Sequence, residues 1–514
     1  MTRKDRLAWT AVVLAALLGA YLRVVNLFSW PPGPWVDEAY ALRAERLLPA
    51  GAPFFGTTAL TPAGEGFVNA WATNVYLRFA RVVDVAAGGG LASFRWLSAA
   101  PSLALLAALL LLAIEAGRER PLARGVAAVL GASSMWLLTT GRWGWDAVAT
   151  SALAALATWA GLRAARTLSA ALALLAGASA GLGAYGYAAG RLFLAAPAVV
   201  LVLALARRAA GRELARLAGM ALAAEVAVLA PLAAHYASHP ERLFAREQEL
   251  SLLRHGGADA GLLLARNVAD YGALFLWRGD ANERHGDPAR PVVPAAVAGL
   301  ALLGAAAGAV RGGAGRALLL PAGLFLAGGL LASEETGANA YRISPMAPYV
   351  LVLAGLGADA LVALFAPRAR RLAAAVAAAV VALAAASDIA GFARWGASPR
   401  TWGAFGGPER ALADALVAAS RSGPPARIVL DWRSAARNPY VVEELLAPPG
   451  ARRGAVIFDA DFAAGAGPLR QNVLYADGGA LEAAGLAGHR GSVVASGTDP
   501  WGRPTFTVYR LSPD

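Results

Sequence analysis

Cysteine is absent from this chain of 514 residues, lysine occurs once, at Lys4, and histidine occurs five times. Without cysteine the chain has no disulfide framework, no thiolate metal site and no cysteine nucleophile. Charged residues make up only 16% and hydrophobic residues as much as 58%, whereas soluble domains average about 25% and about 45–50%. The composition excludes an ordinary soluble enzyme and indicates that lipid is the solvent of much of the chain.

Long apolar runs recur along the sequence. A helix needs about 20 mostly apolar residues to cross about 30 Å of hydrocarbon, because each residue adds about 1.5 Å. By this criterion we expect about eleven membrane-spanning helices. They are predicted near residues 7–27, 91–113, 122–138, 147–162, 168–185, 192–205, 217–234, 292–310, 317–331, 345–365 and 372–389.

Basic residues occupy every second connection between these expected helices. They precede the first span and follow the second, fourth, sixth, eighth and tenth. Because short cytoplasmic loops collect arginine and lysine, this alternation predicts a cytoplasmic N-terminus and an external C-terminus. The net charge of +12 is then mostly a topology signal, and no run of charge suits nucleic acid.

The external face carries the long connections. Residues 28–90 and 235–291 are predicted external loops, and the first is expected to hold interfacial helices near 39–48 and 67–85. The spans and loops together form a membrane module over residues 1–391.

The composition changes near Gly391, after the last expected span. A helix is predicted over 408–420, with proline in its first turn as helices prefer. Short β-type runs are expected at 427–430, 455–458, 472–475, 492–495 and 505–511. The fold class expected is therefore an α-helical polytopic membrane protein with a small extracytoplasmic α/β domain over 392–514, for which acceptor recognition is one role to consider.

Three acids of the first external loop are candidates for the chemistry of a site. Asp37 and Glu38 follow a Pro-Pro-Gly-Pro turn, and Glu65 lies further on. Asp37 has two interpretations, as the cap of the interfacial helix that begins near Ala39, or as a general base at the membrane boundary. A capping role explains one of the two adjacent carboxylates, Asp37 and Glu38, but not the presence of both. Glu65 is either a solvated loop residue or an acid of the same site.

Three arginines, Arg142, Arg191 and Arg342, fall in short loops on the same face as Asp37, where the topology rule does not require them. They snorkel to lipid headgroups, pair with a local acid such as Asp146, or form a cationic pocket for a phosphate. Because the chain has a single lysine, the choice of arginine at these positions carries no information.

Arg284 and His285 close the second external loop. Their side chains suit contact with a phosphate or a sugar, and a solvated loop fits them equally well. The chain has no His-Glu-x-x-His zinc motif and no phosphate-binding G-x-x-x-x-G-K motif. Its one G-x-S-x-G match, Gly177 to Gly181, falls within an expected membrane span and not at a strand-to-helix turn. The sequence therefore points to none of the familiar zinc, nucleotide or serine-hydrolase sites.

The order of these motifs resembles membrane glycosyltransferases of the GT-C class, in the family 39-like group. That group includes protein O-mannosyltransferases and bacterial aminoarabinose transferases acting on lipid A. The resemblance covers most of residues 1–405. It is carried by Leu22-Arg23, Asp37-Glu38, Glu65 to Trp71, Gly141 to Gly144, Tyr185 to Arg191, Arg284 to Pro291, Tyr341 to Pro348 and Phe392 to Phe405.

The resemblance implies inverting transfer of a sugar from a polyprenyl-phosphate carrier to an acceptor hydroxyl, on the outer face of the cytoplasmic membrane. It implies that Asp37 is the base, with Glu38 beside it, and that Glu65 is a second acid or a metal ligand. The expected contacts to the donor phosphate are Arg142, Arg191, Arg342, Arg284 and His285. No cofactor is certain, and a divalent metal is left open. The partners implied are the lipid-linked donor, an acceptor, membrane lipid and no nucleic acid.

The sequence departs from the family at two places. No His-Pro-Pro element follows Glu65, which leaves the acceptor class open. The C-terminal domain does not match the β-trefoil of the eukaryotic mannosyltransferases, so protein O-mannosylation does not follow from the resemblance.

A carboxylate and a cationic pocket are enough for this chemistry. Breaking the sugar–phosphate bond adds negative charge to the phosphate, so arginines stabilise the transition state more than the ground state. The acceptor hydroxyl needs a base, which contributes about 10² to 10⁴ in rate.

Two other function classes remain at this stage. A transporter or flippase for lipid-linked sugars would place ionisable groups near mid-membrane, where Glu225 is the one clear candidate. A non-catalytic scaffold would use the external domain for assembly.

Overall fold

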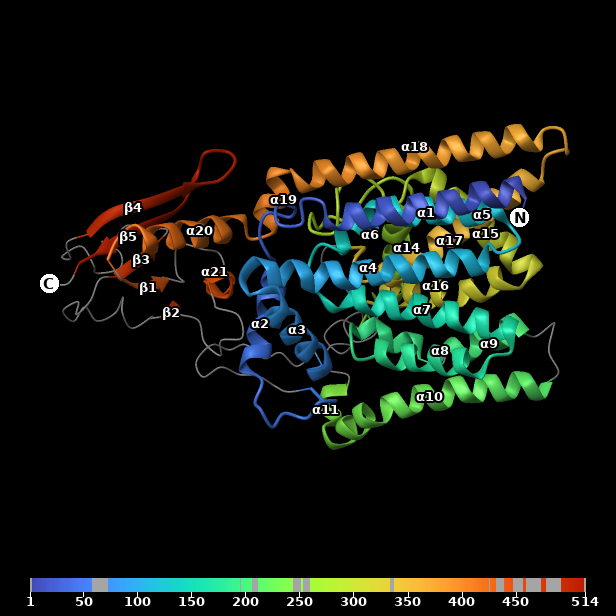
Figure 1. Cartoon of the computed structure of the whole chain (residues 1–514), viewed down its shortest axis with the longest axis horizontal. Helices are drawn as coiled ribbons and strands as arrows, with labels where there is room; N and C mark the ends of the chain where they lie inside the picture. The colour runs from blue at the N-terminus through green and yellow to red at the C-terminus, as the bar shows by residue number, and fades with distance from the viewer. Residues whose placement is uncertain are drawn as a thin grey trace.

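The structure is a computed structural model that describes residues 2–57, 73–194, 196–205, 211–243, 251–252, 259–332, 337–424, 426–430, 439–446, 456–458, 473–477 and 491–512. A bundle of long helices forms one end of the molecule and a small α/β domain forms the other (Figure 1). This confirms the predicted fold class.

Helices occur at all the predicted spans. Six of the helices in the described ranges, α1, α4, α7, α10, α17 with the turn before it, and α18, are long and apolar enough to cross a membrane. The others that match predicted spans are shorter. The bounds are α1 Arg3–Val24, α4 Gly90–Ala116, α5 Pro121–Ser133 with α6 Met135–Thr140, α7 Asp146–Thr167, α8 Ala170–Gly183, α9 Ala196–Leu205, α10 Gly211–Ser238, α15 Ala295–Arg311, α16 Ala314–Leu330, α17 Ala347–Ala363 and α18 Arg370–Gly396.

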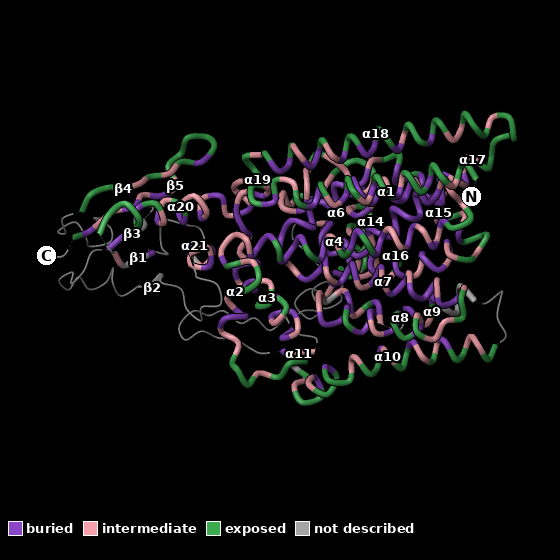
Figure 2. The backbone as a smooth tube through the Cα atoms, viewed as in Figure 1, coloured by how far each residue is buried: buried purple, intermediate pink, exposed green. Residues whose placement is uncertain are grey.

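Small residues bring the central helices together. α7 and α17 lie in the buried middle of the bundle, whereas α10 and α18 are largely exposed along its sides (Figure 2). A Cβ added at Gly304 of α15 would lie 1.9 Å from the carbonyl oxygen of Leu353 in α17. Glycine therefore permits a backbone contact that a larger residue would prevent, as is common between membrane helices.

The two long connections that the sequence predicts to be external contain further helices. The first holds α2 (Val36–Leu47) and α3 (Asn74–Ala87), close to the predicted interfacial helices, although residues 58–72 lie outside the described part. The second holds α11 (Pro240–Leu243) and α14 (Ala260–Leu276), and α14 packs against α15 and α16. The sequence did not predict α14, because Arg266 and Asp270 interrupt its apolar run; here they form an ion pair of 3.7 Å.

The C-terminal domain contains a mixed five-stranded sheet with the order β2-β1-β3-β5-β4. β1 pairs in parallel with β2 and β3, whereas β5 is antiparallel to β3 and β4. The predicted β-type runs all fall on strands, and α18 continues through the boundary predicted at residue 391. The bounds are α19 Pro399–Ala404, α20 Gly407–Arg421, β1 Arg427–Leu430, α21 Pro439–Leu446, β2 Val456–Phe458, β3 Val473–Asp477, β4 Gly491–Thr498 and β5 Pro504–Leu511.

The C-terminal domain docks on the connection between α1 and α4 through α21 and α2. Glu444 of α21 forms a buried ion pair of 2.6 Å with Arg46, and Glu443 pairs with Arg43. Val441 packs in the same hydrophobic cluster as Leu42. These contacts hold α2, whose first turn carries the Asp37-Glu38 pair.

Candidate active site

An aromatic cluster joins three loops at the end of the bundle that faces the C-terminal domain. Trp143, between α6 and α7, lies 4.3 Å from Tyr341 and 5.4 Å from His285, measured between ring centroids. Phe405, which follows α19, contacts the edge of the cluster at 6.1 Å from Trp143. The aromatic rings therefore bring together segments that precede α7, α15 and α17.

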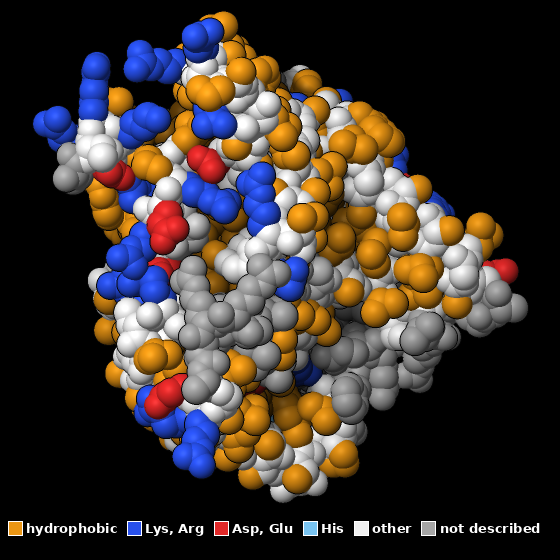
Figure 3. All heavy atoms as spheres, turned by 90° about the vertical axis from the view of Figure 1, so that its right-hand side faces the viewer, with side chains coloured by type: hydrophobic (Ala, Val, Ile, Leu, Met, Phe, Trp, Pro, Cys, Tyr) orange, Lys and Arg blue, Asp and Glu red, His pale blue; other side chains and the backbone are white. Residues whose placement is uncertain are grey.

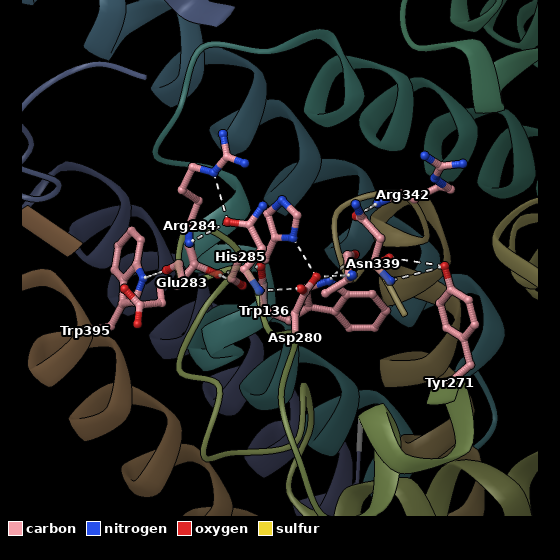
Figure 4. A network of polar contacts seen from close by, with 12 residues as sticks. Trp136, Tyr271, Asp280, Glu283, Arg284, His285, Asn339, Arg342 and Trp395 are labelled. Carbon is pink, nitrogen blue, oxygen red and sulfur yellow. Dashed lines mark hydrogen bonds and ion pairs between the residues drawn. The ribbon is translucent and has the colours of Figure 1, made fainter. Parts of the chain in front are cut away.

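His285 is fixed by a carboxylate that the sequence analysis did not single out. Its Nδ1 lies 2.5 Å from Oδ2 of Asp280, and the same oxygen accepts the Ala340 backbone N–H at 2.6 Å (Figure 4). The imidazole stacks on Trp143 and on Tyr341 with interplanar angles of 17° and 19°. His285 is thus a buried, oriented side chain, and the alternative of a solvated loop residue is not observed.

Arg284 connects the second external loop to the first. Its guanidinium lies 3.6 Å from the centroid of the Trp35 ring, and its Nε donates to Oδ1 of Asn282 at 2.9 Å. Burial lowers the pKa of Arg284, while Asp37 and Asp280 act in the opposite direction. Arg284 therefore lies within electrostatic range of Asp37.

Glu38 caps the first turn of α2. Its two carboxylate oxygens accept the backbone N–H groups of Trp35 at 2.6 Å and of Gly144 at 2.7 Å. The guanidinium of Arg95 in α4 lies 4.0 Å from Glu38 and donates to the carbonyl of Pro31. Glu38 thus joins α2 to the loop before α7 and fixes the helical turn that also carries Asp37.

We expect replacement of Glu38 to change how stability depends on pH. Burial raises the pKa of Glu38 to about 7 from its ordinary 4.5, against the opposing effects of Arg95 and the two N–H groups. The folded protein holds this proton more tightly than the unfolded chain, so stability falls as pH rises from about 4.5 to about 7. In Glu38→Gln this contribution, roughly 3 kcal/mol, disappears.

The measurement is thermal unfolding of wild type and Glu38→Gln at pH 5 and at pH 8. The wild type should lose more stability between the two values than the variant. Equal losses would contradict the buried, proton-binding state of Glu38. Glu38→Ala should be less stable than Glu38→Gln at both values, because it leaves two buried N–H donors without an acceptor.

Asp146, at the start of α7, is a second acid of the site. Its side chain is 6% exposed, and its Oδ1 has no hydrogen-bond partner within the described residues. It lies within electrostatic range of Asp37 and Arg191. Burial, followed by the nearby Asp146, raises the pKa of Tyr341 well above its ordinary value, so the phenol keeps its proton.

Asp146 does not pair with Arg142, which was one alternative left open by the sequence. The Nη2 of Arg142 instead donates to the carbonyls of Leu22 and Val25, each at 2.7 Å. The guanidinium also lies 5.0 Å from the centroid of the Phe392 ring. Arg142 is therefore buried at the C-terminal end of α1, where a cation satisfies carbonyls that the helix leaves open.

Arg191 lies in the short helix η1 (Ala188–Phe193), at the mouth of an apolar groove. Its Nη1 donates to the carbonyl of Leu243 at 2.7 Å and its Nη2 to the hydroxyl of Tyr236 at 2.8 Å. The groove has a volume of about 470 Å³, and Leu194, Leu229 and Leu232 contribute to its walls. Arg191 is thus placed where an apolar surface meets the acids of the site.

For Arg342 and Glu65, the two remaining predicted site residues, the structure gives less information about side-chain contacts. Arg342 is 9% exposed, and its backbone N–H donates to Oδ1 of Asn339 at 2.8 Å (Figure 4). Glu65 lies outside the described residues. Within the part of the chain that the structure describes, no three His, Asp or Glu side chains gather in a way that would hold a metal ion.

The fold is that of a multi-pass membrane protein, with acids and arginines gathered at one end of the helix bundle. No protein-family model matches the chain, and no curated protein matches it in sequence. The solved structures of ArnT from Cupriavidus metallidurans are similar to it over 97% of both chains. ArnT in the apo state has a TM-score of 0.58 and 14% identity. ArnT bound to undecaprenyl phosphate has a TM-score of 0.53 and 13% identity. The fold implied by the family resemblance is thereby confirmed.

Proposed function

We propose that this protein is an inverting glycosyltransferase that moves a sugar from a polyprenyl-phosphate carrier to an acceptor hydroxyl. The proposal is carried by the ArnT-like fold and by the electrostatic proximity of Asp37 to Asp146 and Arg284, and of Asp146 to Arg191, at one end of the bundle. The likeness to ArnT bound to undecaprenyl phosphate supports a donor of this chemical class.

The residues divide into those that contact substrate and those that hold the site. Asp37 takes the proton of the acceptor hydroxyl while the oxygen of that hydroxyl attacks the anomeric carbon of the donor sugar. The bond from that carbon to the phosphate oxygen breaks, and polyprenyl phosphate leaves as a monoester. Arg191 and Arg284, with His285 and Arg342, are assigned to the donor phosphate. Glu65 keeps its proposed role as a second acid or metal ligand.

Two predicted site residues receive a positioning role instead. Arg142 uses Nη2 on the carbonyls of Leu22 and Val25, and Glu38 uses both oxygens on backbone N–H groups. Their partners are parts of this chain and not substrate. We therefore assign Arg142 to the end of α1 and Glu38 to the start of α2, where both fix the loops that carry the acids.

The membrane orientation is also proposed. Basic residues at the end of the bundle that carries the N-terminus favour a cytoplasmic location for that end. The candidate site and the C-terminal domain, residues 392–514, then lie outside the cytoplasmic membrane of the cell. The contact between α21 and α2 suits a domain that stabilises the site.

The proposal is tested by supplying purified protein with a panel of labelled polyprenyl-phosphate sugars in detergent or vesicles. We expect wild-type protein to release polyprenyl phosphate from one of these donors in the presence of a membrane extract that supplies the acceptor. Movement of intact donor across vesicles without release would instead support a flippase. Absence of release from every donor class would overturn the proposal.

Arg191→Gln is expected to raise the KM for the lipid donor by roughly ten- to a hundredfold, with a smaller change in kcat. One charge-assisted contact to a phosphate contributes about 1.5–3 kcal/mol. The measurement is the initial rate of carrier release against donor concentration. Arg278→Gln is the control, because Arg278 pairs with Asp270 and its side chain is 56% exposed. An unchanged KM would remove Arg191 from the donor site.

A further inference from the structure

A cavity lined by arginines lies at the end of the bundle opposite the candidate active site. Its volume is about 330 Å³. Lysine and arginine side chains gather on this face of the molecule (Figure 3). The charged residues that line the cavity are Arg118, Arg120, Arg166, Arg311 and Arg316, together with Glu115 and Glu119.

The turn between α15 and α16 forms one wall of this cavity. Gly312 and Gly313 have φ values of +73° and +67°, a region in which glycine has no steric penalty. A Cβ added at Gly308 would lie 2.7 Å from the backbone of Gly315, so the two helices meet closely just before the turn. This tight turn holds Arg311 and Arg316 beside the ends of α4 and α7.

The acids of the cavity do not balance its arginines. Glu115 is already paired with Arg163 at 3.2 Å and with Arg166 at 2.6 Å. Arg120 lies 3.8 Å from Asp359. Arg118 is exposed and makes no hydrogen bond or ion pair with the described residues. The cavity therefore keeps a net positive charge that an anion would compensate.

The cavity continues toward the lipid-facing surface. Arg118, Arg166 and Glu115 also line a neighbouring hollow of about 430 Å³, whose other wall includes Trp9 of α1 and Ile114 of α4. The outer surface of α1 is apolar there, with Leu7 63% exposed. A ligand with a charged head and an apolar tail would fit both regions, whereas a free anion would use only the cavity.

We propose that this cavity binds the anionic headgroup of a membrane phospholipid, with the acyl chains passing along α1 and α4. Basic pockets between helix ends at the cytoplasmic side of a membrane are suited to phosphodiester headgroups. The topology rule accounts for arginines at this end of the bundle, but it does not require that they line one cavity. The inference concerns a lipid site and does not depend on the proposed transferase activity.

The test uses full-length protein in neutral detergent, titrated with phosphatidylglycerol in mixed micelles while thermal unfolding is followed. Parallel titrations use phosphatidylcholine and inorganic phosphate. We expect saturable stabilisation by phosphatidylglycerol alone. Arg118→Gln with Arg311→Gln should weaken the apparent affinity about 25-fold, since each arginine contributes about fivefold. Both positions are exposed, so the double variant is expected to fold.

The matched control is Arg212→Gln with Arg368→Gln, which removes two exposed arginines from the same end of the bundle but not from the cavity. Its affinity should equal that of wild type. Equal weakening in both double variants would overturn the proposal and leave only general surface charge. Stabilisation by inorganic phosphate as strong as that by phosphatidylglycerol would also overturn it, because the ligand would then be a free anion.

A second measurement needs no variant. Wild-type protein is photolabelled with a phosphatidylglycerol that carries a diazirine next to its headgroup. We expect labelled peptides from residues 115–120 and 311–316. Labelling spread evenly over all lipid-facing helices would contradict a defined site.

Discussion

Asp37→Asn is expected to lower the rate of sugar transfer by about 10² to 10⁴, with little change in the affinity for the donor. Asparagine keeps the size of the side chain but cannot accept the proton of the acceptor hydroxyl at the moment of attack. Because Glu38 makes the cap of α2, loss of the Asp37 charge should leave the fold intact. The measurement is release of polyprenyl phosphate under saturating donor, together with thermal unfolding of the same preparation.

Two further variants make this result specific. Asp414→Asn is the control, since the Asp414 side chain is 73% exposed in the C-terminal domain, and it should retain full activity. Asp146→Asn distinguishes the two acids of the site. If Asp37→Asn remained active while Asp146→Asn did not, the base would be Asp146, and Asp37 would only contribute charge near Arg284.

Arg142→Gln is expected to destabilise the protein by roughly 2–6 kcal/mol. The substitution leaves the buried carbonyls of Leu22 and Val25 without their donor, and each such group costs about 1–3 kcal/mol. The measurement is the temperature at which the solubilised protein unfolds, followed by donor KM in the fraction that remains folded. We expect a large fall in stability and a nearly unchanged KM.

Arg142→Lys separates the positioning role from a phosphate contact. Lysine keeps the charge, but its ammonium is a compact group and does not reproduce the fixed fork of the guanidinium. If Arg142 bound the donor phosphate, lysine would restore much of the KM and glutamine would leave stability unchanged. That pattern would return Arg142 to the donor site.

Local patterns gave most of the secondary structure. Hydropathy over about 20 residues located the helices from α1 to α18, and short β-type runs located the strands. α14 was missed because the charges of Arg266 and Asp270, which neutralise each other across one helical turn, lower its apparent hydropathy. A hydropathy average adds a fixed value for each residue, so it does not include the effect of an ion pair between two of them.

The contacts of the candidate site differ in how far apart their residues lie in the sequence. Asp280 and His285 are five residues apart in the chain, so their pairing had a local signal that the sequence analysis did not use. Glu38 and Gly144 are separated by 106 residues, and no local pattern relates them. Asp146 was considered only as a neighbour of Arg142 because it is close in sequence, whereas in the fold its charged neighbours are Asp37 and Arg191.

Composition and patterning were sufficient to establish a many-helix membrane chain with an α/β domain at its C-terminal end, because burial in lipid and strand alternation are properties of short segments. They also predict that Asp37, Arg142, Arg191 and Arg342 share one face of the membrane. Contacts between distant segments were needed to assign roles to these residues. The guanidinium of Arg142 reaches a carbonyl 120 residues away, and no pattern of neighbouring residues encodes a contact over that distance in the chain.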